Sequence, residues 1–176
     1  MTAPVLYTLY DLLVDALRQL YAAEQEHLRA LPRMATAAQT PELVRVFNDH
    51  LGETEEQVSR LERIFAHLEE CPEGGTCAGM DGVLLECDSL ILTQGHPDVL
   101  NAALISAAHR VEHYEMAAYG TARVVAELLG EEAITQLLEA SYREEQGTDR
   151  LLNLIATRKV NQRALTASAP LADAVE

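Results

Sequence analysis

Apolar residues recur every three or four positions along four long stretches of the chain, with polar residues between them. This period predicts amphipathic α-helices. We place the four long helices at about residues 8–34, 41–68, 98–129 and 131–156, and a shorter helix at 80–92. Two helical hairpins separated by a long crossover that carries its own helix are typical of a four-helix bundle with one extended connection. The fold class predicted from this pattern is all-α.

Residues that stop or start helices divide the chain at the expected places. Thr40-Pro41 offers an N-cap residue followed by proline in the first turn, and Gly130 suits a helix C-terminus. The segments 70–77 and 94–98 are rich in turn-forming residues. We therefore expect one domain over residues 1–157, and a flexible tail over 158–176, where the periodicity ends.

Three of the predicted apolar stripes carry an acid near their centre. At about 100° per residue, Glu24, Glu115 and Glu145 each lie within about 20° of the stripe of their own helix. Burying an ionised carboxylate costs several kcal/mol unless a partner neutralises it. Hardly any Lys or Arg faces inward on these stripes, so a salt bridge does not account for the acids.

Further acids and histidines lie close to the same stripes. Glu112, His27, His50 and Asp149 fall on or near the apolar faces, Glu53 lies at a boundary, and Glu56 points outside. An offset of 91 residues carries Glu24 onto Glu115 and Glu53 onto Glu144, which suggests that the two hairpins are related by a pseudo-twofold axis.

Several buried carboxylates with one or two histidines are the usual ligands of a pair of iron or manganese ions. A single buried Glu is more often a hydrogen-bonded core residue, but three central acids in three helices favour a metal site. For His27 and His50 both explanations stay open, because a histidine at an apolar edge is often a core residue with its hydrogen bonds satisfied.

Composition argues against some classes of partner but does not identify a function. The 176 residues carry a formal charge of -15, which argues against nucleic acid or an anionic membrane as a partner. No segment has the length and apolarity of a signal peptide or a membrane span, so we expect a cytoplasmic protein. Cys71, Cys77 and Cys87 could hold zinc or form a redox-sensitive disulfide, but their spacing is a weak zinc signal and reduced thiols are expected.

Four segments carry a resemblance to a known family: residues 21–24, 48–55, 111–115 and 144–149, of which Val111-Glu112-His113-Tyr114-Glu115 is the most specific. Over residues 6–157 the chain resembles the YciE/YciF family of bacterial stress-associated proteins, within the ferritin-like superfamily. The resemblance implies a ferritin-like fold, a rubrerythrin-like dinuclear metal site, a cytosolic location and a homodimer. It implies no established reaction.

Carried over to this chain, the resemblance gives a ranked set of metal ligands. The first are Glu24, Glu53, Glu112, Glu115 and Glu145, followed by His50 and Asp149, with His27, Glu56 and Glu144 as secondary candidates. His113 should face solvent. The Glu-x-x-His motifs of the wider superfamily are incomplete here, since the fourth helix offers Glu145-x-x-Thr148. The oxygen-rich ligand set favours iron or manganese over zinc or copper.

Two classes of function remain. The protein could be a redox metalloprotein whose two iron or manganese ions react with peroxide or oxygen, or sequester iron, during stress. No pair of Cys-x-x-Cys motifs is present for a rubredoxin-like centre, so electrons would come from an external donor. Alternatively, the bundle is a non-catalytic dimeric scaffold with a vestigial metal site. Whether the protein is an enzyme is left open by the sequence.

Overall fold

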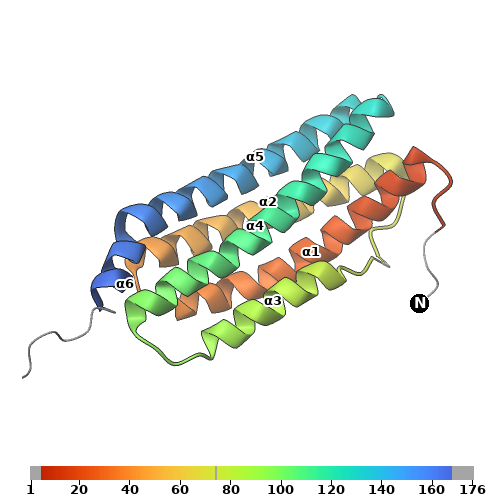
Figure 1. Ribbon diagram of the computed structural model, residues 1–176. Helices are drawn as coiled ribbons and strands as arrows, with labels where there is room; N and C mark the ends of the chain where they lie inside the picture. Colours follow the sequence, from red (N-terminus) through yellow and green to blue (C-terminus); the bar gives the residue numbers. More distant parts are fainter. Residues whose placement is uncertain (1–4, 74, 168–176) are drawn as a thin grey trace, which may run out of the picture.

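The structure, a computed structural model, describes residues 5–73 and 75–167, and every regular element in this part of the chain is helical. The four long helices are α1 (Leu9–Ala37), α2 (Pro41–Leu68), α4 (Pro97–Leu128) and α5 (Glu132–Ile155), and the shorter α3 (Ala78–Ile91) lies in the crossover (Figure 1). The predicted all-α bundle with an extra helix between its two hairpins is confirmed.

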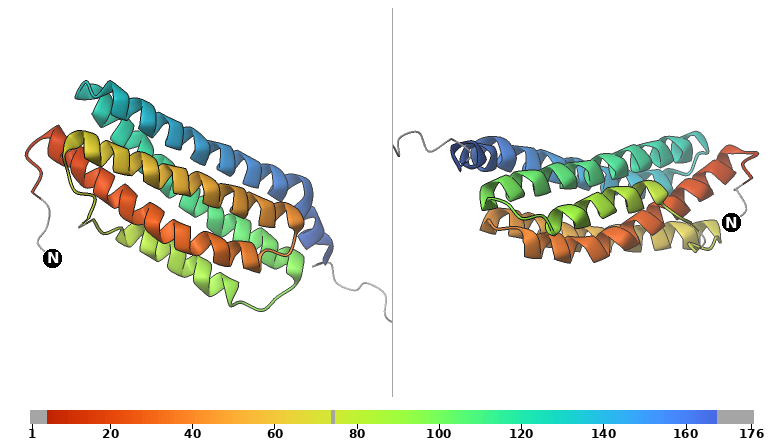
Figure 2. Two further views of the ribbon diagram at one scale, coloured as in Figure 1. Left: turned by 180° about the vertical axis from the view of Figure 1, so that it is seen from behind. Right: turned by 60° about the horizontal axis from the view of Figure 1, so that its bottom comes forward.

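The two hairpins, α1 with α2 and α4 with α5, lie side by side and run along a common axis (Figure 2). Helix α1 also packs against α4, and α2 against α5, so the four helices enclose one interior. Helix α3 packs on the outside of α1 and α4. This arrangement brings the inner faces of α1, α2, α4 and α5 together, as a site built from all four requires.

Helix ends follow the local signals of the sequence. At the start of α1, Thr8 and Asp11 form a reciprocal capping box, in which each side chain accepts a backbone N–H of the other residue. Pro41 opens α2. Gly130, between α4 and α5, has a φ of 79°, a left-handed conformation that glycine adopts without steric cost.

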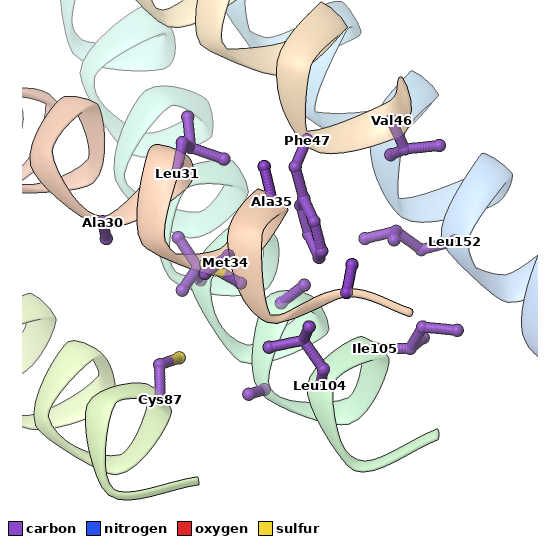
Figure 3. Packing of buried hydrophobic residues seen from close by; sticks show 14 of the residues in the cluster. Ala30, Leu31, Met34, Ala35, Val46, Phe47, Cys87, Leu104, Ile105 and Leu152 are labelled. Carbon is purple, nitrogen blue, oxygen red and sulfur yellow. The ribbon is translucent and has the colours of Figure 1, made fainter. Parts of the chain in front are cut away.

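The apolar core is divided into two clusters along the bundle axis. One cluster is built around Leu31, Phe47, Leu104 and Leu152, which point into a shared interior (Figure 3). The other contains Leu17, Leu61, Phe65, Ala126 and Leu138. The buried acids come from positions between these clusters in each helix, so a polar layer lies between two apolar ones.

The C-terminal segment differs from the prediction. In place of a flexible tail from residue 158, the helix continues through a π-helical turn, Ala156–Val160, into α6 (Asn161–Ala167). Val160 is 1% exposed and belongs to the first apolar cluster, which holds this segment against the bundle. The rest of the predicted tail, residues 168–176, lies outside the described residues.

The three cysteines are free thiols at separate places. Cys71 is exposed, whereas Cys77 and Cys87 are buried, and Cys77 Sγ lies 2.9 Å from the Tyr114 hydroxyl. Burial raises the pKa of Cys87 to about 11, so this thiol stays protonated at neutral pH. Within the described residues no cysteine joins a group that could bind a metal.

None of the helices in the described part of the chain is long and apolar enough to cross a lipid bilayer.

Candidate metal centre

Four acids are buried in the polar layer: Glu24 from α1, Glu112 and Glu115 from α4, and Glu145 from α5. Each is at most 2% exposed. His27 of α1 and His50 of α2 lie among them, each 1% exposed. All four long helices therefore contribute to one buried cluster of carboxylates and imidazoles.

The atoms of this cluster form three overlapping groups of potential ligands. The groups are His50, Glu112, Glu115 and Glu145; Glu24, His27 and Glu115; and His27, His50 and Glu112. Within each group the ligand atoms lie no more than 4.8 Å apart. Overlapping groups of this size fit two neighbouring cations.

The His50 ring connects the buried cluster to the surface. Its Nε2 lies 3.5 Å from Glu112 Oε2 and 3.6 Å from Glu145 Oε2. Its Nδ1 lies 3.0 Å from Glu53 Oε2, and because an ionised carboxylate can only accept a hydrogen bond, we assign the ring proton to Nδ1. Nε2 is then free to bind a cation, held in orientation by an outer carboxylate, as is usual for histidine ligands.

Several oxygens and one nitrogen of the cluster have no hydrogen-bond partner. These atoms are Glu24 Oε2, His50 Nε2, Glu112 Oε2, Glu115 Oε2 and Glu145 Oε2. Buried polar atoms without partners are rare in proteins, because each one costs about 1–3 kcal/mol. Five of them in one polar layer form a pattern that fits a site for cations, which would supply the missing partners.

Burial and mutual repulsion disturb the ionisation of these acids. Burial raises the pKa of Glu24 and Glu112 well above the ordinary value, and the charges of Glu115 and Glu145 raise both further. The pKa of Glu145 is also raised, by burial and by the charge of Glu115. Burial lowers the pKa of His50, but the hydrogen bond to Glu53 and the charge of Glu145 outweigh this effect, and the net shift is upward.

The four buried carboxylates carry a charge of -4 when ionised, and two divalent cations would balance it. The ligands are mostly oxygen atoms with one or two imidazoles, which suits iron or manganese. The residues that the structure brings together therefore fit a dinuclear centre.

A second ring of side chains supports this cluster. Gln57 donates hydrogen bonds to Glu145 Oε1 and, over 3.2 Å, to Glu144 Oε2. Thr148 Oγ1 lies 3.2 Å from His50 Nδ1 and 3.3 Å from Glu53 Oε2. The outer oxygens of Glu144 pair with Arg60 at 2.5 and 2.7 Å. These contacts fix the positions of the inner groups.

A surface depression of about 600 Å³ lies between α2 and α5, beside the cluster. His50, Glu53 and Thr148 line it, together with Asp49 and Arg143. Glu53 is half-exposed, with 43% of its side chain accessible, whereas His50 is 1% exposed. His50 is the one inner residue that the depression touches among the described residues.

The structure separates the predicted ligands into an inner and an outer set. The inner set is Glu24, His27, His50, Glu112, Glu115 and Glu145. Glu53 instead contacts the outer nitrogen of His50, and Glu144 pairs with Arg60. Glu56 is exposed, as its angle on the helix predicted.

Asp149 was expected at the buried site, but the structure places it elsewhere. Its Oδ1 lies 2.7 Å from His109 Nδ1 and 3.1 Å from His113 Nε2, on the outer side of α4 and α5. Asp149 lies one turn after Glu145, at the edge of the inner face of α5, and its carboxylate contacts the two imidazoles on the outer side. His113 is 65% exposed, as predicted.

Sequence reasoning gave too little weight to three residues of the site: Gln57, Arg60 and Tyr119. Tyr119 is fully buried, and its hydroxyl donates a 2.5 Å hydrogen bond to Glu24 Oε1. It stands four residues after Glu115, one turn along the same helix face, and that spacing was the available signal. Tyr114, which lies on the same helix, instead contacts Cys77, outside the cluster.

Removing the Tyr119 hydroxyl should destabilise the metal-free protein. In Tyr119→Phe, Glu24 loses the hydrogen bond on Oε1 while its Oε2 already has no partner. We expect the free energy of unfolding to fall by about 1–3 kcal/mol, measured by urea denaturation of chelator-treated protein. Tyr142→Phe removes a hydroxyl that makes no hydrogen bond within the described residues, and should change stability by less than about 0.5 kcal/mol. Equal losses in the two variants would contradict the assigned role.

The fold and the cluster together define the class: a ferritin-like helical bundle with a buried carboxylate–histidine cluster in its core. Residues 8–165 match the family described as "Domain of unknown function (DUF892)". The chain belongs to this family, which includes the stress protein YciF.

Comparisons with individual proteins agree. The chain is 35% identical over 158 residues to the protein YciF of Escherichia coli (strain K12), covering 89% of this chain and 95% of that protein. The crystal structure of the E. coli stress protein YciF superposes with a TM-score of 0.86 at 34% identity, over 89% of this chain and 99% of that one. The structure of YcfI from Rhodopseudomonas palustris superposes with a TM-score of 0.83 at 37% identity, over 87% of this chain and 98% of that one.

A protein of Xanthomonas campestris shares the fold at a TM-score of 0.72 and 21% identity, over 92% of this chain and 100% of that one. The resemblance found in the sequence to the YciE/YciF family is thus confirmed.

Proposed function

We propose that this stress-protein relative binds two iron or manganese ions in its polar layer and uses them to consume peroxide or oxygen. The observation that carries the proposal is the set of five buried ligand atoms without hydrogen-bond partners, drawn from all four long helices. Glu24, Glu112, Glu115, Glu145 and His50 would hold the ions, with His27 as a further ligand.

When bound, such a metal pair supplies two-electron redox chemistry. The chain contributes the rest of what the reaction needs. The depression between α2 and α5 touches His50, where a small oxidant would approach the cluster. The hydrogen bonds among His50, Glu53 and Thr148 offer a path for protons from the surface to the cluster. Electrons would be supplied by an external donor protein.

A dimeric, non-catalytic scaffold is the second candidate, and one set of contacts favours it. Glu24, Glu115 and Glu145 each have one oxygen hydrogen-bonded, by Tyr119, His27 and Gln57. In that case, the acids would be hydrogen-bonded core residues that need no metal. Light scattering of the purified chain tests the dimer in either case, and a monomeric mass would contradict it.

Metal content and turnover separate the two candidates. Protein purified without chelator or a metal-binding tag would be analysed for iron and manganese, then loaded anaerobically with Fe²⁺ and mixed with hydrogen peroxide. The proposal expects about two ions per chain and oxidation of bound Fe²⁺ faster than that of free Fe²⁺. The matched variant Glu115→Ala/Glu145→Ala should lose both, whereas Glu55→Ala/Glu56→Ala, which removes two exposed acids from α2, should keep both. A protein that binds neither iron nor manganese would favour the scaffold function.

A further inference from the structure

A second group of potential metal ligands lies outside the buried cluster and shares no residue with it. It consists of His109 and His113 of α4 and Asp149 of α5, whose ligand atoms are within 4.8 Å of one another. We propose that these three side chains form a surface site for a divalent transition metal ion of the zinc type. This inference does not depend on the proposed function of the buried centre.

The spacing of the two histidines is suited to a shared ion. His109 and His113 are four residues apart, so both project from one face of α4, one turn from each other. The two rings meet nearly edge to face, with centroids 6.2 Å apart and planes inclined at 72°. Two histidines at this helical spacing are a common pair of zinc ligands.

Asp149 supplies the third ligand from the neighbouring helix. Its Oδ1 is 2.7 Å from His109 Nδ1 and 3.1 Å from His113 Nε2. Ligand atoms around a tetrahedral zinc ion stand about 3.4 Å apart, given bonds of about 2.0–2.1 Å. To admit an ion, the carboxylate would therefore move away from His109 by about 0.7 Å and from His113 by about 0.3 Å.

The site is partly open to solvent. The side chains of His109 and Asp149 are 25% and 23% exposed, and His113 is 65% exposed, so water can complete the coordination. Within residues 5–73 and 75–167, no Lys or Arg forms an ion pair with Asp149, and the adjacent Arg110 pairs with Glu86. In this part of the chain, no ion pair with a basic side chain competes with a metal for the carboxylate.

The donor atoms distinguish this site from the buried one. Two imidazoles and one carboxylate with an open position resemble the ligand set of zinc in hydrolases, whereas the buried cluster is rich in oxygen. We expect zinc or cobalt to prefer the outer site and manganese the inner one. In the metal-free protein, the same three side chains would simply be a carboxylate that accepts two imidazole hydrogen bonds.

The test counts zinc ions bound by the full-length chain. Wild type, His109→Ala/His113→Ala and the control His67→Ala/His96→Ala would be dialysed against buffered Zn²⁺ and analysed for bound metal. The control also removes two exposed histidines that contact acids, but among the described residues neither belongs to a group of three possible ligands. The proposal expects the first variant to bind about one zinc ion fewer than wild type, and the control to match wild type.

A second readout does not depend on removing the histidines. Asp149→Asn should weaken zinc binding at this site at least about tenfold, a loss of about 1.4 kcal/mol. In wild type, substoichiometric Zn²⁺ should shift the ring NMR signals of His109 and His113 before those of His67. Equal zinc stoichiometry in wild type and the His109/His113 variant would overturn the proposal, as would an equal loss in the control.

Discussion

Titration of the metal-free protein with Mn²⁺ is expected to raise its melting temperature by about 5–10 °C. A ligand at about 100 times its Kd stabilises the native state by about 2.7 kcal/mol, and a domain of this size gains about 2–4 °C for each kcal/mol. The gain comes from neutralising four carboxylates, which are buried together in the polar layer. Circular dichroism melts at neutral pH, with Mn²⁺ added after chelator treatment, measure the effect.

A variant of the cluster should show the opposite pattern. Glu115→Gln/Glu145→Gln removes two buried charges but keeps the shape of both side chains, so the metal-free variant should melt at or above the wild-type temperature. Addition of Mn²⁺ should not raise the melting temperature of this variant. The control Glu55→Gln/Glu56→Gln has the same change of charge at exposed positions and should respond to Mn²⁺ as wild type does. A full Mn²⁺ response in the cluster variant would contradict the assignment of these ligands.

The metal-free protein should be more stable at pH 5.5 than at pH 8. The pKa values of Glu24, Glu112 and Glu145 in the folded state are raised above 4.5, the ordinary value for Glu. Folded protein then binds more protons than unfolded protein, so the stabilisation is fully present below pH 4.5 and is lost as the pH rises through the folded pKa values. The raised pKa of His50 acts in the same direction.

Urea denaturation at both pH values measures this dependence. Each unit of pKa shift corresponds to about 1.4 kcal/mol. Glu53, whose pKa is lowered by its hydrogen bond to His50, contributes in the opposite sense, but only as the pH falls below 4.5. The triple variant Glu24→Gln/Glu112→Gln/Glu145→Gln should lose most of this dependence and keep only the part that comes from His50. A wild-type protein that gains stability toward pH 8 would contradict the raised pKa values.

The fold was predictable because it depends on periodicity. Apolar stripes, Thr40-Pro41 and Gly130 place the long helices to within a few residues of their observed ends. The C-terminal helix was not predictable in this way, since α6 has no buried side chain and, beyond Ala156, only Val160 packs into the core. A single large apolar residue in a segment rich in Ala, Ser and Thr does not produce the three-to-four-residue repeat from which a helix is predicted.

The inner acids were predictable because their angle on the helix decides burial, and Glu24, Glu115 and Glu145 lie at the centre of their stripes. The positions of acids at the edges of the apolar stripes were not predictable, since contacts with neighbouring helices decide where those side chains point. Asp149 contacts His109 and His113 outside the cluster, and Glu144 pairs with Arg60. The offset of 91 residues related Glu53 to Glu144. The same offset relates buried Glu145 to Thr54, so α2 lacks the inner carboxylate that its counterpart provides.

The division of the apolar core also has a consequence for motion. Each apolar cluster joins the helices at one end of the bundle, whereas the level between them depends on charged and polar groups. Without cations, repulsion among the acids acts at that level alone, and helices held at both ends can only bow apart in the middle. Local opening would therefore concentrate where an incoming ion or oxidant must pass, and a bound metal pair would close the bundle behind it.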